Sequence, residues 1–309
     1  MKADRDQSGA GPVRSTYPTL PALAGLALLL AAGLISGCAS TAGQWTIPPV
    51  ETAEPDQPWA EALARIHADH VRANDAESLA RIIARLEALL DSHPGAAAVR
   101  VELAEALVLY GAAYATGRSV KRHLFSDAQA HAESALLTNP GFRSAIEAGQ
   151  RPGLAASKLE SADLPAMVIW ATATAYLFDE GMTGLGRLRN FRGLEDLRLF
   201  MEQAMTLAPE HEYGLVPFSL AVFHIAAPPI AGGDLDRAAA LIEQAIATPG
   251  VSLLPKWGRA RYLHALTGDR EARRADLEWV LAQDPSTADS PYRWNVFVQR
   301  DARRMLESL

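Results

Sequence analysis

The chain has 309 residues, a net charge of −7, 49% hydrophobic residues and a single cysteine. This length supplies enough apolar side chains for one sizeable core. A single cysteine excludes an intramolecular disulfide, and an acidic chain without a basic cluster is a poor candidate for binding nucleic acid. Alanine, leucine, arginine and glutamate are abundant and runs of β-branched residues are few, which favours an all-α protein.

The first 37 residues have the pattern of an export signal. Three basic residues precede a continuous apolar run over residues 22–35, which suits a signal-peptide core and is too short for a membrane span. The run ends in Leu34-Ile35-Ser36-Gly37-Cys38, which resembles the lipobox of bacterial lipoproteins. The resemblance implies cleavage before Cys38 and lipidation of Cys38, so we interpret this lone thiol as a lipid attachment point rather than a nucleophile.

The predicted domain organisation follows from this signal. Residues 1–37 form the signal peptide, residues 38–58 a lipid-anchored flexible linker with four prolines, and residues 59–309 one helical domain. By analogy with the sorting of Gram-negative lipoproteins, Ala39-Ser40 after the cysteine favours the outer membrane, facing the periplasm.

Helices are expected along most of the folded part. Their predicted ranges are 59–73, 74–91, 96–114, 126–139, 165–178, 215–227 and 292–306, with further helices ending near Pro209, Pro249 and Pro285. Capping boxes are predicted at Asn74-x-x-Glu77 and Ser126-x-x-Gln129, and N-caps at Asp234 and Asp269. Residues 141–162 are expected to be an irregular insertion, and the glycine- and arginine-rich residues 181–193 a loop.

A spacing of the form E-x-x-[LM]-x-x-x-P recurs before four prolines, with a copy one residue shorter before a fifth; these are Pro94, Pro140, Pro209, Pro285 and the shorter Pro249. Each copy predicts the last turns of an amphipathic helix that proline stops. Counting back from these prolines places small and medium apolar residues on one face, as in Leu197, Met201 and Ala204. This pattern is typical of the second helix of a tetratricopeptide (TPR) hairpin. We predict a TPR-like helical-hairpin array, an alpha-alpha superhelix; an ordinary helical bundle is the alternative.

Candidate catalytic and metal sites are weak. His67 and His70 have a spacing that suits metal ligation, but no third ligand motif lies near them, and solvated histidines are the simpler interpretation. Residues 181–187 resemble a phosphate-binding loop in glycine content only, since no strand precedes them. No acid–base or nucleophile constellation is present, so we predict no enzyme, no metal and no cofactor.

The predicted helices 165–178 and 215–227 are too apolar to lie on the surface, and they carry aromatic and polar side chains. A third helix, after Pro255, adds basic and aromatic side chains. One interpretation is core packing with the bases extended to solvent. The other is an apolar cavity with a few polar anchors, the usual makeup of a small-molecule site. On the second interpretation the candidate ligand residues are Trp170, Tyr176, Phe223, His224, Lys256, Arg261 and Tyr262.

The order of these weak motifs resembles one known family. The motifs, in chain order, are the helix containing Trp170 and Tyr176, Glu202…Pro209, Pro228-Pro229-Ile-Ala-Gly-Gly-Asp234, Lys256-Trp-Gly-Arg-Ala-Arg-Tyr262 and Pro291…Asn295…Ala302. On these motifs the chain from about Leu164 to Leu306 resembles the T component of TRAP transporters, the TatT lipoproteins. The insertion at 141–162 and the segment 181–193 depart from the family pattern.

The resemblance implies an all-helical periplasmic lipoprotein that forms a homotrimer. It also implies a hydrophobic or organic-acid ligand and pairing with a periplasmic substrate-binding P component. Asn295 would be a packing or capping residue. The alternative function is a TPR-like scaffold that grips proteins of the cell envelope and binds no small molecule.

Overall fold

The computed structural model describes Trp45 and residues 59–309, except for the side chain of Leu188. The predicted signal peptide, Cys38 and the rest of the predicted linker lie outside these residues. The α-helices are α1 (Trp59–His70), α2 (Ala76–Ser92), α3 (Ala97–Ala113), α4 (Arg118–Leu136), α5 (Pro140–Glu147), α6 (Pro152–Ala155), α7 (Leu164–Tyr176), α8 (Gly184–Arg189), α9 (Phe191–Leu207), α10 (Leu215–Ala226), α11 (Leu235–Ala247), α12 (Leu254–Gly258), α13 (His264–Thr267), α14 (Arg270–Ala282) and α15 (Tyr292–Glu307). No β-strand occurs in the described part of the chain, and the all-α prediction is confirmed.

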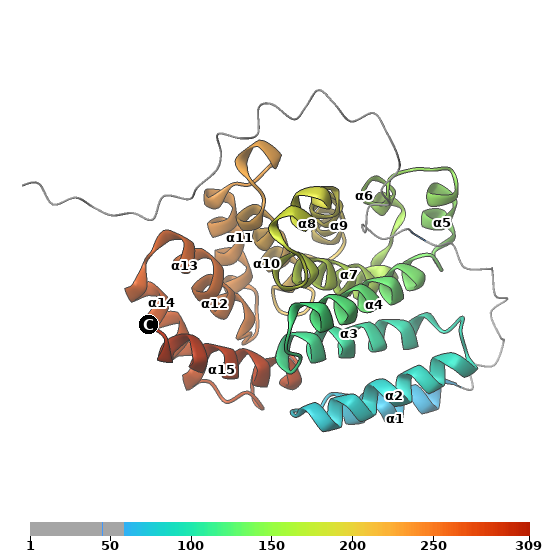
Figure 1. The fold of residues 1–309 in the computed structure, drawn as a ribbon, viewed down its shortest axis with the longest axis horizontal. Helices are drawn as coiled ribbons and strands as arrows, with labels where there is room; N and C mark the ends of the chain where they lie inside the picture. Colours follow the sequence, from blue (N-terminus) through green and yellow to red (C-terminus); the bar gives the residue numbers. More distant parts are fainter. Residues whose placement is uncertain (1–44, 46–58) are drawn as a thin grey trace, which may run out of the picture. The chain divides into compact units, whose positions relative to one another are not determined.

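Helices that follow one another pair as hairpins. α1 packs on α2, α3 on α4, α7 on α9, α10 on α11 and α14 on α15 (Figure 1). Neighbouring hairpins contact through α2 with α3, α4 with α7 and α9 with α10. This succession agrees with the predicted hairpin array, whereas the superhelical geometry of a TPR protein stays a prediction.

The proline-stopped helices are found where the repeated spacing predicts them. α2, α4, α9, α11 and α14 all end within four residues before their prolines. The small apolar face is buried in each case tested: Leu197, Met201 and Ala204 on α9 are at most 2% exposed. The matching residues of α4 and α11, mostly alanine, are at most 4% exposed. Small side chains let the paired helix approach closely, which explains the pattern.

Two predicted capping boxes are wrong. Asp75, not Asn74, caps α2, because its side chain accepts a hydrogen bond from the Ser78 backbone N–H at 2.8 Å. α4 begins at Arg118, so Ser126 lies inside the helix. Gln129 is buried there and donates to the Thr174 hydroxyl at 3.2 Å. A capping spacing cannot distinguish a helix start from polar positions within a helix. The caps predicted at Asp234 and Asp269 are confirmed.

The two segments predicted to be irregular are largely helical. Residues 141–162 form α5, α6 and two short 3-10 turns. Within residues 181–193, α8 starts after Thr183, whose side chain accepts from the Gly186 backbone N–H, and α9 starts at Phe191. A capping threonine and the following leucines outweigh the glycines, which lower helix propensity only modestly.

Trp45 is the described part of the predicted linker, and it contacts the folded body. Its ring lies 5.2 Å from Phe142, 6.0 Å from Trp170 and 6.2 Å from Phe200, measured between centroids. Trp170 and Phe200 stack at 4.6 Å. These distances are typical of favourable aromatic pairs. The linker is therefore held to the body at this residue.

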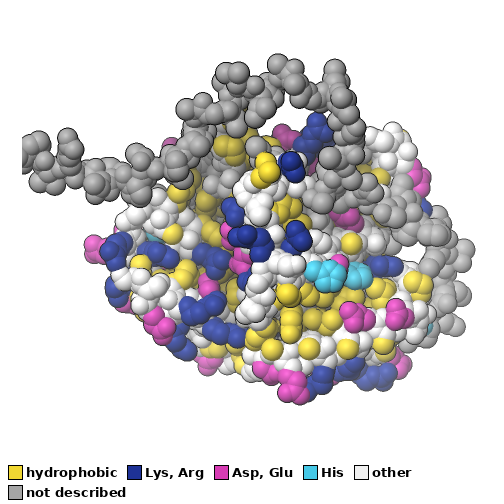
Figure 2. All heavy atoms as spheres, in the orientation of Figure 1, with side chains coloured by type: hydrophobic (Ala, Val, Ile, Leu, Met, Phe, Trp, Pro, Cys, Tyr) yellow, Lys and Arg dark blue, Asp and Glu magenta, His cyan; other side chains and the backbone are white. Residues whose placement is uncertain are grey.

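None of the helices in the described part of the chain is long and apolar enough to cross a membrane. On the face drawn in Figure 2, acidic and basic side chains are interspersed, with apolar side chains between them.

Candidate functional site

A cavity of about 560 Å³ lies among α7, α10 and α15. Most of its wall is apolar. α7 contributes Val168, Ala171, Thr172 and Ala175, and α10 contributes Phe218 and Val222. A volume of this size and an apolar wall are usual for a site that holds a small organic molecule.

The sequence of α7 explains why space is left beside it. The cavity-lining residues recur at the i, i+3, i+4 and i+7 spacing of one helical face. Two are alanine and one is threonine, so this face projects little into the hollow. The opposite face carries Trp170 and Thr174, which line a separate hollow of about 220 Å³ together with Glu133 and Gln129.

Two π-helical segments close one end of the cavity. η3 (Leu177–Gly181) follows α7, and η5 (Arg259–Leu263) joins α12 to α13. Such bulges are often found at functional sites. Phe178 and Asp179 from η3 and Tyr262 from η5 line the cavity beside Tyr176. Burial raises the pKa of Tyr262 to about 12, so its phenol stays neutral.

Arg261 holds the two π-helical segments together. Its guanidinium donates to Asp301 at 2.8 Å and to Glu180 at 3.1 Å. Lys121 of α4 also pairs with Glu180. Asp301 accepts a further hydrogen bond from the Trp257 indole at 3.0 Å. The network fixes the end of the cavity through partly buried charge-assisted bonds.

A second group of polar residues lies where α3 and α15 meet the turn before α10. Glu105 Oε1 accepts from Arg293 Nε at 2.9 Å and from the Trp294 indole at 2.9 Å. Glu212 of the turn also lines the cavity, and 45% of its side-chain surface is accessible. Burial, and then the charge of Glu105, raise the pKa of Glu212 to about 7.

The turn that carries Glu212 has an unusual backbone. Glu212 and Tyr213 have φ of 47° and 56°, and Gly214 follows with φ of 90°. Left-handed positions are strained for residues other than glycine and persist where the surrounding structure holds them. A Cβ at Gly214 would lie 2.5 Å from the Ala245 carbonyl of α11, so only glycine fits this close approach.

Three of the seven candidate ligand residues line the cavity: Tyr176, Phe223 and Tyr262. The other four are placed elsewhere. Trp170 belongs to the opposite face of α7, where its indole donates to Glu133 at 3.1 Å. The Arg261 side chain is engaged in the ion-pair network behind the wall.

His224 and Lys256 also lie outside the cavity lining. The His224 ring has Nδ1 2.9 Å from the Gly232 carbonyl oxygen, so it ties α10 to the following loop. The Lys256 ammonium lies 4.0 Å from the centroid of the Trp279 ring, a cation–π contact. Helical position alone did not reveal which side of each helix faces the hollow.

Sequence reasoning missed several lining residues, among them Glu105, Glu212, Trp257 and Trp294. One signal was available for Glu105, an acid in the largely apolar helix α3, which also carries Glu102. Glu212 lies in a short turn and gave no pattern. Asn295 lines the cavity and also bonds Ser290, with its Nδ2 2.7 Å from the Ser290 carbonyl oxygen, which suits the expected packing role.

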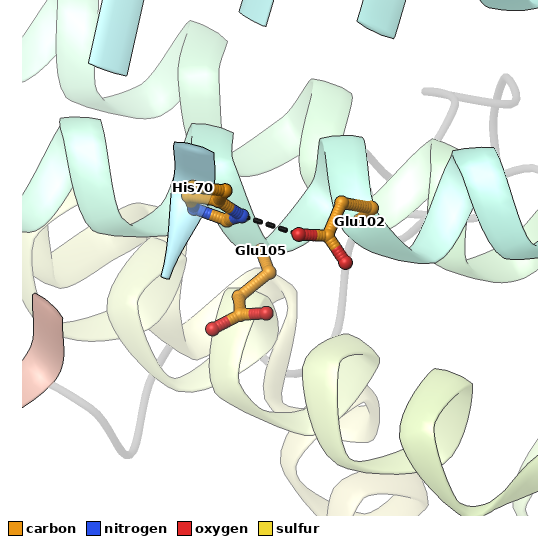
Figure 3. Close-up of side chains that lie close together, drawn as sticks. All are labelled: His70, Glu102 and Glu105. Carbon is orange, nitrogen blue, oxygen red and sulfur yellow. Dashed lines mark hydrogen bonds and ion pairs between the residues drawn. The ribbon is translucent and has the colours of Figure 1, made fainter. Parts of the chain in front are cut away.

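Of the pair His67 and His70, only His70 differs from the solvated interpretation, because the His67 side chain is 52% exposed. His70 is fully buried, and its Nδ1 lies 2.5 Å from Glu102 Oε1 on α3 (Figure 3). His67 Nδ1 lies 3.0 Å from the same oxygen. Burial acts to raise the pKa of Glu102, but the bonds to both histidines outweigh it and hold the pKa at about 2. The pair therefore joins α1 to α3.

His70, Glu102 and Glu105 are close enough to hold a metal ion, with ligand atoms within 4.8 Å of one another. Their existing partners argue against that use. Glu102 is engaged by both histidines, and Glu105 is neutralised by Arg293 at 2.5 Å. A cation placed here would meet the Arg293 guanidinium, so we assign the cluster to helix packing.

These features define an all-α hairpin protein with an apolar cavity. The chain matches the model of the TRAP transporter T-component family over residues 75–309, and it belongs to that family. The match confirms the family predicted from the sequence. No curated protein matches the chain closely.

Proposed function

We propose that this T component binds a small hydrophobic ligand in the cavity among α7, α10 and α15. The carrying observation is the cavity itself, about 560 Å³ with a mostly apolar wall. Burying an apolar ligand there would gain free energy in proportion to the apolar surface removed from water. Two neutral phenols and the polar groups of α3 and α15 would orient it. The role is that of an accessory rather than an enzyme.

The ligand site is tested by native mass spectrometry of the purified protein and by titration with 1-decanol. Val222→Trp fills the cavity from α10 and should abolish both a retained ligand and decanol binding. Val120→Trp is the matched control, because Val120 is 51% exposed on α4 and does not line the cavity. Unchanged binding in Val222→Trp would contradict the site.

We also propose the surroundings in which this site works. The protein is lipid-anchored at Cys38, faces the periplasm, with the outer membrane favoured by Ala39-Ser40, and assembles as a homotrimer that pairs with a P component. Family membership and the lipobox resemblance support this. Cys38→Ser should abolish lipid labelling, and light scattering should give three copies per particle.

The pairing is tested by co-purification with a P component encoded beside it. Failure to associate with such a protein, together with absence of any cavity ligand, would favour an envelope scaffold that binds only proteins. That function predicts capture of a peptide on the hairpin surface without effect of Val222→Trp.

A further inference from the structure

The charged residues of the cavity wall are unevenly matched. Within the described part of the chain, the lining includes three carboxylates, Glu105, Asp179 and Glu212, and one guanidinium, Arg187. The Arg187 side chain donates to the backbone oxygen of Asp179 at 2.9 Å, and the Asp179 carboxylate lies 3.6 Å from Arg261. Asp179 therefore has a basic neighbour. The other two carboxylates, Glu105 and Glu212, lie where α3 and α15 meet the turn before α10, and the question is whether each has a positively charged partner.

Glu105 is already compensated. Both Arg293 and the Trp294 indole donate to its Oε1, at 2.5 Å and 2.9 Å for the closest atoms. Arg293 is 7% exposed, so its charge is committed to this bond rather than to solvent. An ion pair buried in this way leaves little attraction for a second carboxylate.

Glu212 has no such partner. No hydrogen bond joins its carboxylate to another of the described residues, and the nearest basic nitrogen is His211 Nε2 at 3.8 Å. Burial lowers the pKa of His211, so its imidazole is neutral at neutral pH and supplies no counter-charge. Burial is the main cause of the raised pKa of Glu212, the charge of Glu105 adds to it, and the charge of Arg293 opposes it.

Extending the proposed ligand-binding function, on which this inference rests, we propose that the cavity selects an amphiphile with an apolar chain and a protonated amine head group. The ammonium donates to the Glu212 carboxylate, and the chain lies along the small residues of α7. A carboxylate head would instead face the Glu212 carboxylate at the same end and be repelled by it. The proposed ligand is therefore an amphiphilic amine and not an organic acid.

Three probes with one chain length test the head group on the full-length Cys38→Ser protein: decylamine, 1-decanol and decanoate. Binding is followed at pH 8 by calorimetry and by tryptophan fluorescence, since Trp257 and Trp294 line the cavity. We expect decylamine to bind at least about tenfold more tightly than decanoate, because an ion pair replaces a like-charge contact. Decanol should fall between them.

Glu212→Gln keeps the size of the side chain and removes its charge. It should therefore weaken the binding of decylamine about tenfold and leave the affinity for 1-decanol unchanged. Glu210→Gln is the matched control, an exposed acid two residues away that does not line the cavity. Decanoate binding as tightly as decylamine in the unsubstituted chain would overturn the head-group inference alone. Binding of none of the three probes would overturn the ligand-binding function as well.

Discussion

The two faces of α7 are equally apolar in sequence and differ in what they face. One face presents Ala171, Thr172 and Ala175 to the large cavity. The other carries Trp170, stacked 4.6 Å from Phe200 and bonded to Glu133. The helix is buried on nearly all sides, yet one side borders a cavity of about 560 Å³ and the other a smaller hollow of about 220 Å³. Burial of a helix therefore does not say whether its neighbours are side chains or space for a ligand.

The largest expected effect lies on the face that carries Trp170. Trp170→Ala should lower the free energy of unfolding by about 3–5 kcal/mol, the usual loss when a large buried side chain is removed. Binding of 1-decanol to the folded protein should be unchanged, because Trp170 does not line the large cavity. Urea unfolding and a titration measure the two quantities. A loss of binding with little loss of stability would move Trp170 to the ligand site.

The next effect concerns the network that closes the cavity. Arg261→Met should lower the free energy of unfolding by about 2–4 kcal/mol, because it leaves the buried carboxylate of Asp301 without its main partner. Arg304 bonds the same carboxylate at 2.7 Å but is 64% exposed, so Arg304→Met should cost under about 1 kcal/mol. Equal losses in thermal unfolding of the two variants would show that burial of Arg261 has no special effect.

The free energy of unfolding should also depend on pH through the face of α7 that carries Trp170. Burial raises the pKa of Glu133, beside Trp170, to about 7. Between about pH 4.5 and 7 the unfolded chain releases this proton before the folded chain does, so stability falls as pH rises. The loss is at most about 3 kcal/mol. Glu133→Gln should flatten this part of the curve of unfolding free energy against pH, and an unchanged curve would mean that Glu133 is ionised in the folded protein.

Much of the fold could be predicted because its signals are local. Proline stops a helix wherever the chain runs, so Pro94, Pro140 and Pro209 marked helix ends from sequence alone. Capping spacings are also local but less specific, since Ser126 fits the pattern inside α4. Glycine content misled at residues 181–193, where Thr183 caps a helix despite the glycines.

The site was harder to predict because it depends on which helix faces meet. Tyr176 and Tyr262 are far apart in sequence and come together only through the two π-helical segments. Glu105 and Glu212 become a pair only when the turn before α10 reaches α3. A local sequence pattern does not predict such long-range contacts. The expectation of an apolar cavity with polar anchors needed only the composition of α7 and α10, which are apolar and contain aromatic residues.

The smallest expected change in stability is also the sharpest comparison of the two faces. Ala175→Phe points a ring into the cavity and should alter stability by under about 1 kcal/mol, because the space is already there. Decanol affinity should fall by at least about tenfold as the ring takes its place. Ala173→Phe makes the same substitution two residues away, at a position that is 0% exposed and lines neither hollow. Ala173→Phe should lower the free energy of unfolding by about 1–3 kcal/mol or more, because the ring overpacks a filled site. If the two variants unfold at the same urea concentration, α7 has no open face and the cavity does not exist in solution.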